Sequence, residues 1–137
     1  MSKMIFINLP VRDLAASTAF YAAIGCTRND QFSDENASSM AWSDDIIFML
    51  LSRDYYATFT SKPIADAHTA SAMLIALSCD SRADVDRLVE AAGQHGGRAD
   101  ARPAQDLGFM YQRSFEDPDG HGFEPTHMDM SAMGEAA

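Results

Sequence analysis

Residues 114–124 read SFEDPDGHGFE, and they predict two strands joined by a tight turn. Pro118 presets φ at the first central position of the turn, Asp119 can hydrogen-bond its own backbone, and Gly120 tolerates positive φ. A short alternation of apolar and polar residues flanks the turn on both sides, as expected for an antiparallel hairpin. The hairpin is the most clearly specified element of the chain.

The turn also predicts which hairpin residues face each other. With 118–119 as a two-residue loop, Glu116 lies opposite His121. The same register places Arg113 opposite Glu124, so that a guanidinium and a carboxylate share one face of the hairpin.

Length and composition indicate one compact domain. A chain of 137 residues can bury a substantial core, and its hydrophobic fraction of 47% is ordinary for a globular protein. The formal net charge of -10 argues against binding to nucleic acid or to anionic membrane surfaces, because both require basic patches. It fits a solvated acidic surface or a cleft that attracts cationic ligands.

Other features of the chain indicate a cytoplasmic protein. No apolar run approaches the roughly 18 residues of a membrane span, and the N-terminus runs directly into a strand pattern without a secretory signal. Cys26 and Cys79 lie in apolar sequence surroundings and are interpreted as free thiols.

The two halves of the chain repeat one pattern of elements. Each half predicts a strand, a helix and three further strands, and the helices are expected to begin after Asp13 and Ser81. Glycines are expected to end both helices. A fixed shift between the halves aligns like with like, which indicates internal duplication. The aligned pairs are Phe6 with Leu74, Leu9 with Leu77, Val11 with Cys79, Asp13 with Ser81, Phe20 with Leu88, Tyr21 with Val89, and Gly25 with Gly93.

The duplication predicts a single α+β domain, 1–137, built from two βαβββ modules. One helix covers only one face of each sheet, so the other face needs a partner. Two curved mixed sheets that face each other would bury this surface and leave a cleft between the modules. The predicted divisions are the first module at 4–53, a connection at 54–71, the second module at 72–129 and a tail at 130–137.

Four stretches of the chain carry a family resemblance. They are NLPVRDL (8–14) with Phe20, Tyr21 and Gly25, DSR (80–82) with Val85 and Asp86, QDLGFMY (105–111), and FEDPDGH (115–121). Together they resemble the vicinal-oxygen-chelate superfamily, which includes glyoxalases, bleomycin-resistance proteins, extradiol dioxygenases and fosfomycin-resistance enzymes. They are especially similar to a bacterial subgroup labelled predicted lactoylglutathione lyase. The resemblance implies a pair of βαβββ modules and a homodimer.

The resemblance also implies positions for metal ligands. Metal-dependent members carry a ligand in the first strand of each module, and these positions fall on Phe6 and Leu74. Members with four ligands add a glutamate in the last strand of the first module, a position that falls on Met49. The remaining ligand is a glutamate in the last strand of the second module, which falls on Glu124 and is present. Phenylalanine and leucine offer no lone pair and a thioether is a soft ligand, so no metal cofactor is expected at the family positions. A divalent metal would need other donors, for which His68, His121 and His127 show no ligand spacing.

Glu124 is the candidate catalytic residue. In one interpretation it is a base or hydrogen-bond acceptor that points into the cleft. In the other it forms a buried salt bridge with Arg113, kept for structural reasons. The predicted ligand-binding residues are Phe6, Met49, Leu74, Tyr111, Arg113 and Glu124.

The function expected from these residues is metal-independent binding of a small organic molecule, cationic or aromatic, between the modules. The alternative is a metal-dependent lyase or isomerase of the lactoylglutathione-lyase type, with Glu124 as general base or metal ligand and the metal held by donors outside the family positions. A third hypothesis is a non-catalytic protein that serves protein interaction.

Overall fold

A computed structural model of the chain describes residues 3–131, so most of the predicted tail lies outside the described residues. The chain divides into two compact units, Met1–Asp66 and Ala67–Ala137. Within the described range, no helix has the length and apolar character needed to cross a membrane.

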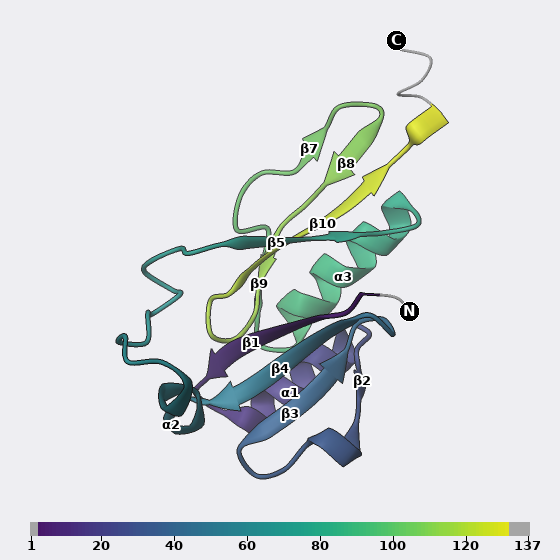
Figure 1. Ribbon diagram of the computed structural model, residues 1–137. Helices are drawn as coiled ribbons and strands as arrows, with labels where there is room; N and C mark the ends of the chain where they lie inside the picture. Colours follow the sequence, from purple (N-terminus) through teal and green to yellow (C-terminus); the bar gives the residue numbers. More distant parts are fainter. Residues whose placement is uncertain (1–2, 132–137) are drawn as a thin grey trace. The chain divides into compact units, whose positions relative to one another are not determined.

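The first unit is a four-stranded sheet with one long helix against it (Figure 1). Its elements are β1 (Ile5–Val11), α1 (Leu14–Ala23), β2 (Thr27–Arg28), β3 (Ala37–Ala41), β4 (Ile46–Ser52) and the short α2 (Arg53–Tyr56), with 3-10 turns at Asp30–Phe32 and Ala57–Phe59. The strand order is β1-β4-β3-β2, in which β1 runs parallel to β4 and the other pairs are antiparallel. The predicted order of strand, helix and three strands is therefore confirmed.

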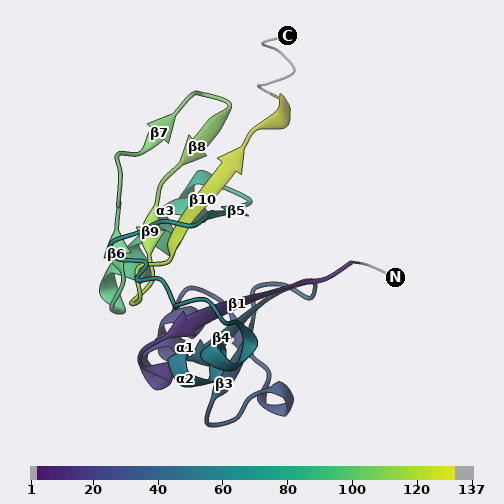
Figure 2. The ribbon, with the colours of Figure 1, turned by 60° about the vertical axis from the view of Figure 1, so that its left-hand side comes forward.

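The second unit begins with the same strand and helix, but five strands follow the helix in place of three. Its elements are β5 (Leu74–Ser78), α3 (Arg82–Gln94), β6 (Arg98–Ala99), β7 (Gln105–Asp106), β8 (Met110–Gln112), β9 (Phe115–Glu116) and β10 (Gly122–Met128). The path through the sheet is β6-β9-β10-β8-β7, and β5 pairs in parallel with β10. The strand β7 was not predicted; it pairs with β8 in a hairpin at one end of the sheet (Figure 2).

Both long helices begin at the predicted caps. The side chains of Asp13 and Ser81 each accept a hydrogen bond from the backbone N–H three residues further on, at 3.0 and 3.1 Å. Gly25, with φ +115°, follows the end of α1 as predicted. Of the glycines expected to close α3 (Gly93, Gly96 and Gly97), Gly96 is the left-handed residue that follows the helix, with φ +95°. Gly93 does not end the helix, which continues to Gln94. Gly93 instead allows close packing, since a Cβ there would lie 3.2 Å from a Cβ of β6.

Each helix buries an apolar stripe against one face of its own sheet. Phe20 and Tyr21 of α1 are fully buried, and the ring centroid of Tyr21 lies 5.6 Å from that of Phe48 in β4. The aligned residues of α3, Leu88 and Val89, are at most 1% exposed. The duplicated pattern therefore marks equivalent core positions, and each unit keeps a sheet face that its own long helix does not cover.

The hairpin between β9 and β10 has a three-residue loop in place of the predicted two-residue loop. The Gly120 N–H donates to the carbonyl of Asp117, and the Asp117 N–H donates to the carbonyl of His121, both at 3.0 Å. Gly120 has φ +89°, so it is the left-handed residue of a G1 bulge that follows the turn. Asp117 is 2% exposed, and its carboxylate accepts two backbone N–H groups of the loop at 2.9 Å.

The additional loop residue shifts the predicted register by one. Glu116 pairs with Gly122, and the Arg113 N–H donates to the carbonyl of Pro125 at 3.3 Å. The predicted pairing of Arg113 with Glu124 is therefore wrong. Because side chains alternate along a strand, a shift of one residue sends Arg113 to the opposite face of the sheet from Glu124.

Candidate functional site

A small hollow lies on the face of the second sheet that α3 does not cover. Its volume is about 120 Å³, less than the roughly 300 Å³ at which pockets for whole drug-sized ligands begin. A hollow of this size admits a functional group or a small molecule. The residues that line it are Leu74, Ala101, Arg102, Ser114, Phe115, Gly122, Phe123 and Glu124.

An ion pair between Arg102 and Glu124 is the central feature of this hollow. The Glu124 oxygen Oε2 accepts from Nη2 of Arg102 at 2.6 Å and from Nε at 3.2 Å. The side chain of Glu124 is 16% exposed and that of Arg102 is 35% exposed. Glu124 does form a salt bridge, as one interpretation predicted, but with Arg102 and not with Arg113.

Uncharged side chains hold both members of the pair in place. The Ser114 hydroxyl accepts from the Arg102 backbone N–H at 3.0 Å. The Gln112 carbonyl oxygen accepts from Nη2 of Arg102, and its amide donates to the Thr126 hydroxyl at 2.9 Å. Thr126 in turn donates to the backbone carbonyl of Glu124 at 2.9 Å. The chain of hydrogen bonds therefore runs from the guanidinium across β8 to β10 and fixes the two charges relative to each other.

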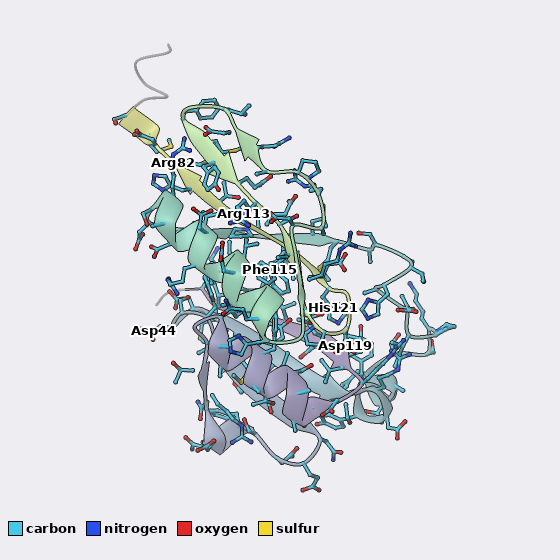
Figure 3. All side chains as sticks on the ribbon, turned by 180° about the vertical axis from the view of Figure 1, so that it is seen from behind. Asp44, Arg82, Arg113, Phe115, Asp119 and His121 are labelled. Carbon is cyan, nitrogen blue, oxygen red and sulfur yellow. The ribbon has the colours of Figure 1, made fainter. Side chains whose placement is uncertain are left out.

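Arg113 and Tyr111 lie on the α3 side of the same sheet, where Arg113 is visible beside the helix in Figure 3. Arg113 is 15% exposed and binds Asp100 through two hydrogen bonds of 2.7 and 3.0 Å. Its Nη1 atom donates to Asp86 at 2.9 Å, and the Tyr111 hydroxyl donates to the same carboxylate oxygen at 2.6 Å. The expectation that Arg113 shares a face with Glu124 is therefore wrong, and the contacts of Arg113 and Tyr111 join the strands to α3.

These contacts shift the pKa values of the groups on the α3 side. The hydrogen bond from Tyr111, followed by that from Arg113, lowers the pKa of Asp86. Arg113 likewise lowers the pKa of Asp100 through its hydrogen bonds. The carboxylate of Asp86 raises the pKa of the Tyr111 hydroxyl, which donates to it. The cluster is thus charged and fully formed at neutral pH.

The Arg82–Asp106 pair predicts a defined loss of stability in acid. Arg82 and the backbone N–H of Gly108 lower the pKa of Asp106 from 3.8 to about 2. The folded state then binds fewer protons than the unfolded chain below pH 3.8, so the contribution of the pair is complete above that pH and is lost as the pH falls toward 2. We expect the stability difference between wild type and Asp106→Asn, measured by urea unfolding, to vanish across this window.

A matched control for this experiment is Glu35→Gln, which alters an exposed acidic residue that has no ion pair within residues 3–131. The difference in unfolding free energy between Glu35→Gln and wild type should not disappear as the pH falls from 3.8 to about 2. A difference for Asp106→Asn that persists unchanged at the lowest pH would contradict the assignment.

The remaining predicted site residues lie on the uncovered face of their own units. Phe6 is 58% exposed, and its register with β4 places it on the same sheet face as the half-buried Met49. In the second unit, Leu74 is 60% exposed and lies opposite Gly122, on the face of Glu124. Their role in ligand binding stays a prediction.

The donors at the family's metal positions do not fit a divalent ion. In the first unit, Phe6 and Met49 supply at most a soft thioether, and in the second unit Leu74 supplies nothing. Glu124 remains, but its Oε2 atom binds the positive charge of Arg102 at 2.6 Å. Throughout residues 3–131, no group of three or more His, Cys, Asp or Glu side chains is arranged to hold a metal ion.

The histidines are used in other contacts. His127 lies on the face opposite Glu124, and its Nδ1 atom is 3.0 Å from the carbonyl oxygen of Cys79. His95 caps α3 through a contact of 2.8 Å between Nδ1 and the Ala91 carbonyl oxygen. His68 contacts the backbone of the β9–β10 loop at 3.2 Å.

Arg102 and Gln112 are site residues that were not predicted. Arg102 lies between two short strands, in a segment without periodicity, so no local pattern places its side chain. Gln112 could have been found from the sequence. If Gly120 is treated as a bulge residue, the strand register places the even-numbered residues of β8 and β9, Gln112 among them, on the same face as Glu124.

A larger hollow in the first unit is a weaker candidate. Its volume is about 570 Å³, and it lies around Gly25, beyond the end of α1. The ion pair between Arg28 and Asp30 lies at its wall. It contains neither of the family's ligand positions in this unit, Phe6 and Met49. The residues that line it are Gly25, Thr27, Arg28, Asn29, Asp30, Ala41, Trp42, Ser43 and Asp44.

Solved structures share this fold at low sequence identity. A hypothetical protein from S. aureus matches with a TM-score of 0.77 and 22% identity, over 93% of this chain and 94% of that chain. A glyoxalase/bleomycin resistance protein/dioxygenase family enzyme from Burkholderia phytofirmans matches with a TM-score of 0.73 and 18% identity, over 93% and 99%. A fosfomycin resistance protein from Mesorhizobium loti matches with a TM-score of 0.64 and 22% identity, over 97% and 95%.

The sequence itself assigns the family. No curated protein matches the chain. The family model described as Glyoxalase/Bleomycin resistance protein/Dioxygenase superfamily matches residues 3–124, a range that runs from before β1 to Glu124. The chain therefore belongs to the glyoxalase/bleomycin resistance protein/dioxygenase superfamily.

Proposed function

We propose that this protein binds a small organic molecule at the Arg102–Glu124 pair, and that it does so without the divalent metal of the family's metal-dependent members. The observation that carries the proposal is the ion pair itself, at 2.6 Å and within the lining of a hollow. Glu124 is the only one of the four residues at the family's ligand positions that has a carboxylate side chain. The assembly proposed from the family resemblance is a homodimer.

Charge supports the metal-independent form of the proposal. A guanidinium already neutralises Glu124, and a divalent cation beside Arg102 would meet electrostatic repulsion in addition to its missing ligands. Two substitutions would therefore be needed before Glu124 became a useful ligand: removal of Arg102, and a donor in place of Leu74.

Metal content and ligand-induced stability together test the proposal. Protein purified without a metal-affinity tag or chelators is expected to contain no near-stoichiometric nickel, zinc, manganese or iron by elemental analysis. Neither a chelator nor added metal should change its melting temperature. A panel of small organic molecules should contain stabilising members, since a ligand present at about 100 times its Kd adds about 2.7 kcal/mol to the unfolding free energy.

A matched pair of variants locates the effect. Glu124→Gln should remove the stabilisation by these ligands, whereas Glu116→Gln alters a carboxylate on the same sheet face that does not line the hollow. A stoichiometric metal whose removal abolishes turnover of a hemithioacetal would overturn the proposal in favour of the lyase alternative. A panel without any stabilising ligand would favour the interaction-protein hypothesis.

A further inference from the structure

We infer that the Arg102–Glu124 pair recognises an uncharged group that presents a hydrogen-bond acceptor beside a donor, such as a carboxamide. The inference rests on the proposed function and specifies its ligand class. It differs from the expectation of a cationic ligand, which followed from the acidic charge of the whole chain.

The first reason is the set of hydrogen-bonding atoms that the pair leaves available. Among residues 3–131, the side-chain hydrogen bonds of Arg102 use only Nε and Nη2, and those of Glu124 use only Oε2. The Nη1 group of Arg102 keeps two N–H donors, and Oε1 of Glu124 remains an acceptor. A carboxamide carries a group complementary to each of these atoms: a carbonyl oxygen that accepts from Nη1 of Arg102 and an N–H that donates to Oε1 of Glu124.

The second reason is that the supporting side chains are already satisfied. The Gln112 oxygen accepts from Arg102, its amide donates to Thr126, and the Thr126 hydroxyl donates to the backbone of Glu124. The Ser114 hydroxyl is likewise bonded to the Arg102 backbone. A ligand therefore need not break any of these bonds, and the pair is preorganised to receive it.

The third reason is charge. Arg102 and Glu124 are the two charged residues in the lining of the hollow, and their charges cancel. A charged ligand would lose its hydration there without meeting an uncompensated opposite charge. An amide loses less hydration free energy on entering the hollow. The exposed side chain of Leu74 makes part of the wall apolar, which increases this difference.

Three probes of matched size and different charge test the inference: propionamide, propionate and propylammonium. Binding is followed by nitrogen–proton correlation NMR of the full chain, at the backbone amides of Ala101 and Gly122, which line the hollow. For wild type we expect propionamide to bind with a Kd about tenfold lower than either ion.

Single substitutions should change the charge preference in opposite directions. Glu124→Gln leaves the guanidinium uncompensated, so propionate should become the preferred probe. Arg102→Gln leaves the carboxylate uncompensated, so propylammonium should be preferred. The double variant, with Arg102→Gln and Glu124→Gln, should again bind propionamide more tightly than either ion. Arg98→Gln and Glu116→Gln, a cross-strand pair outside the lining of the hollow, serve as matched controls that keep the wild-type order.

The outcomes separate this inference from the proposed function. If either ion binds wild type more tightly than propionamide at these amides, the ligand class is overturned while the small-molecule site stands. An unchanged order of probes in both single variants, or the absence of any shift, also overturns it. The metal analysis and the ligand panel then decide independently whether the site binds small molecules at all. If Arg102→Gln does not fold, the reversal in Glu124→Gln remains decisive.

Discussion

Phe115→Ala is expected to lower the unfolding free energy by about 3–5 kcal/mol. Phe115 is 0% exposed, and its ring stacks on Phe123 with centroids 5.0 Å apart and an interplanar angle of 6°. The two rings join β9 and β10 to the buried stripe of α3. Removing one ring loses both the burial of the side chain and the contacts that surround it, and leaves a cavity that the stacked partner cannot fill.

Denaturant unfolding followed by circular dichroism measures this loss. The matched control is Phe32→Ala, in which the ring removed is 64% exposed, so the change should stay within about 0.5 kcal/mol. Similar losses for the two variants would contradict the packing described for the second unit. A change in the denaturant slope for Phe115→Ala would indicate a partly unfolded state and not a simple loss of stability.

Gly120→Ala is expected to be the most damaging of the glycine substitutions in the second unit. Its φ of +89° costs about 1–2 kcal/mol for a residue with a Cβ. In addition, a Cβ would lie 2.7 Å from the backbone nitrogen of His68 and 2.8 Å from the carbonyl carbon of Ala67. Backbone atoms cannot rotate away, so the loop or the neighbouring segment must move, which adds about 1–3 kcal/mol.

Gly108→Ala separates these two effects. Gly108 has φ +83°, but a Cβ there would meet nothing within 4 Å. Gly108→Ala should therefore show only the cost of the positive φ. In unfolding measurements, Gly120→Ala should be less stable than Gly108→Ala by the additional cost of the steric clash. If the two variants lose equal stability, the close approach of His68 to the loop does not contribute.

The local part of the fold could be predicted from the sequence. Asp13 and Ser81 were identified as helix caps because a cap is a contact between residues three apart, which a short window contains. The repeated apolar positions likewise marked the buried sides of α1 and α3, since periodicity alone determines which side of a helix is apolar. The positive φ of Gly25 followed from its place after the first helix.

The candidate site was only partly predictable. The family resemblance indicates Glu124, but a two-residue loop between the strands predicts Arg113 as its partner. Arg102 was missed because its contact spans 22 residues and depends on a segment without regular structure. The predicted salt bridge to an arginine is therefore confirmed as a kind of interaction, but its partner differs because Gly120 adds one residue to the loop.

The loop between β9 and β10 has a consequence for how this site changes in evolution. Substitutions alter one side chain at a time, but loss of a single codon from this loop would exchange the two sets of side chains on β8 and β9 together. Arg113 would then face the hollow in place of Ser114. Relatives whose loops differ by one residue are therefore expected to bind chemically different ligands on the same backbone, and their residues are best compared by counting back from β10.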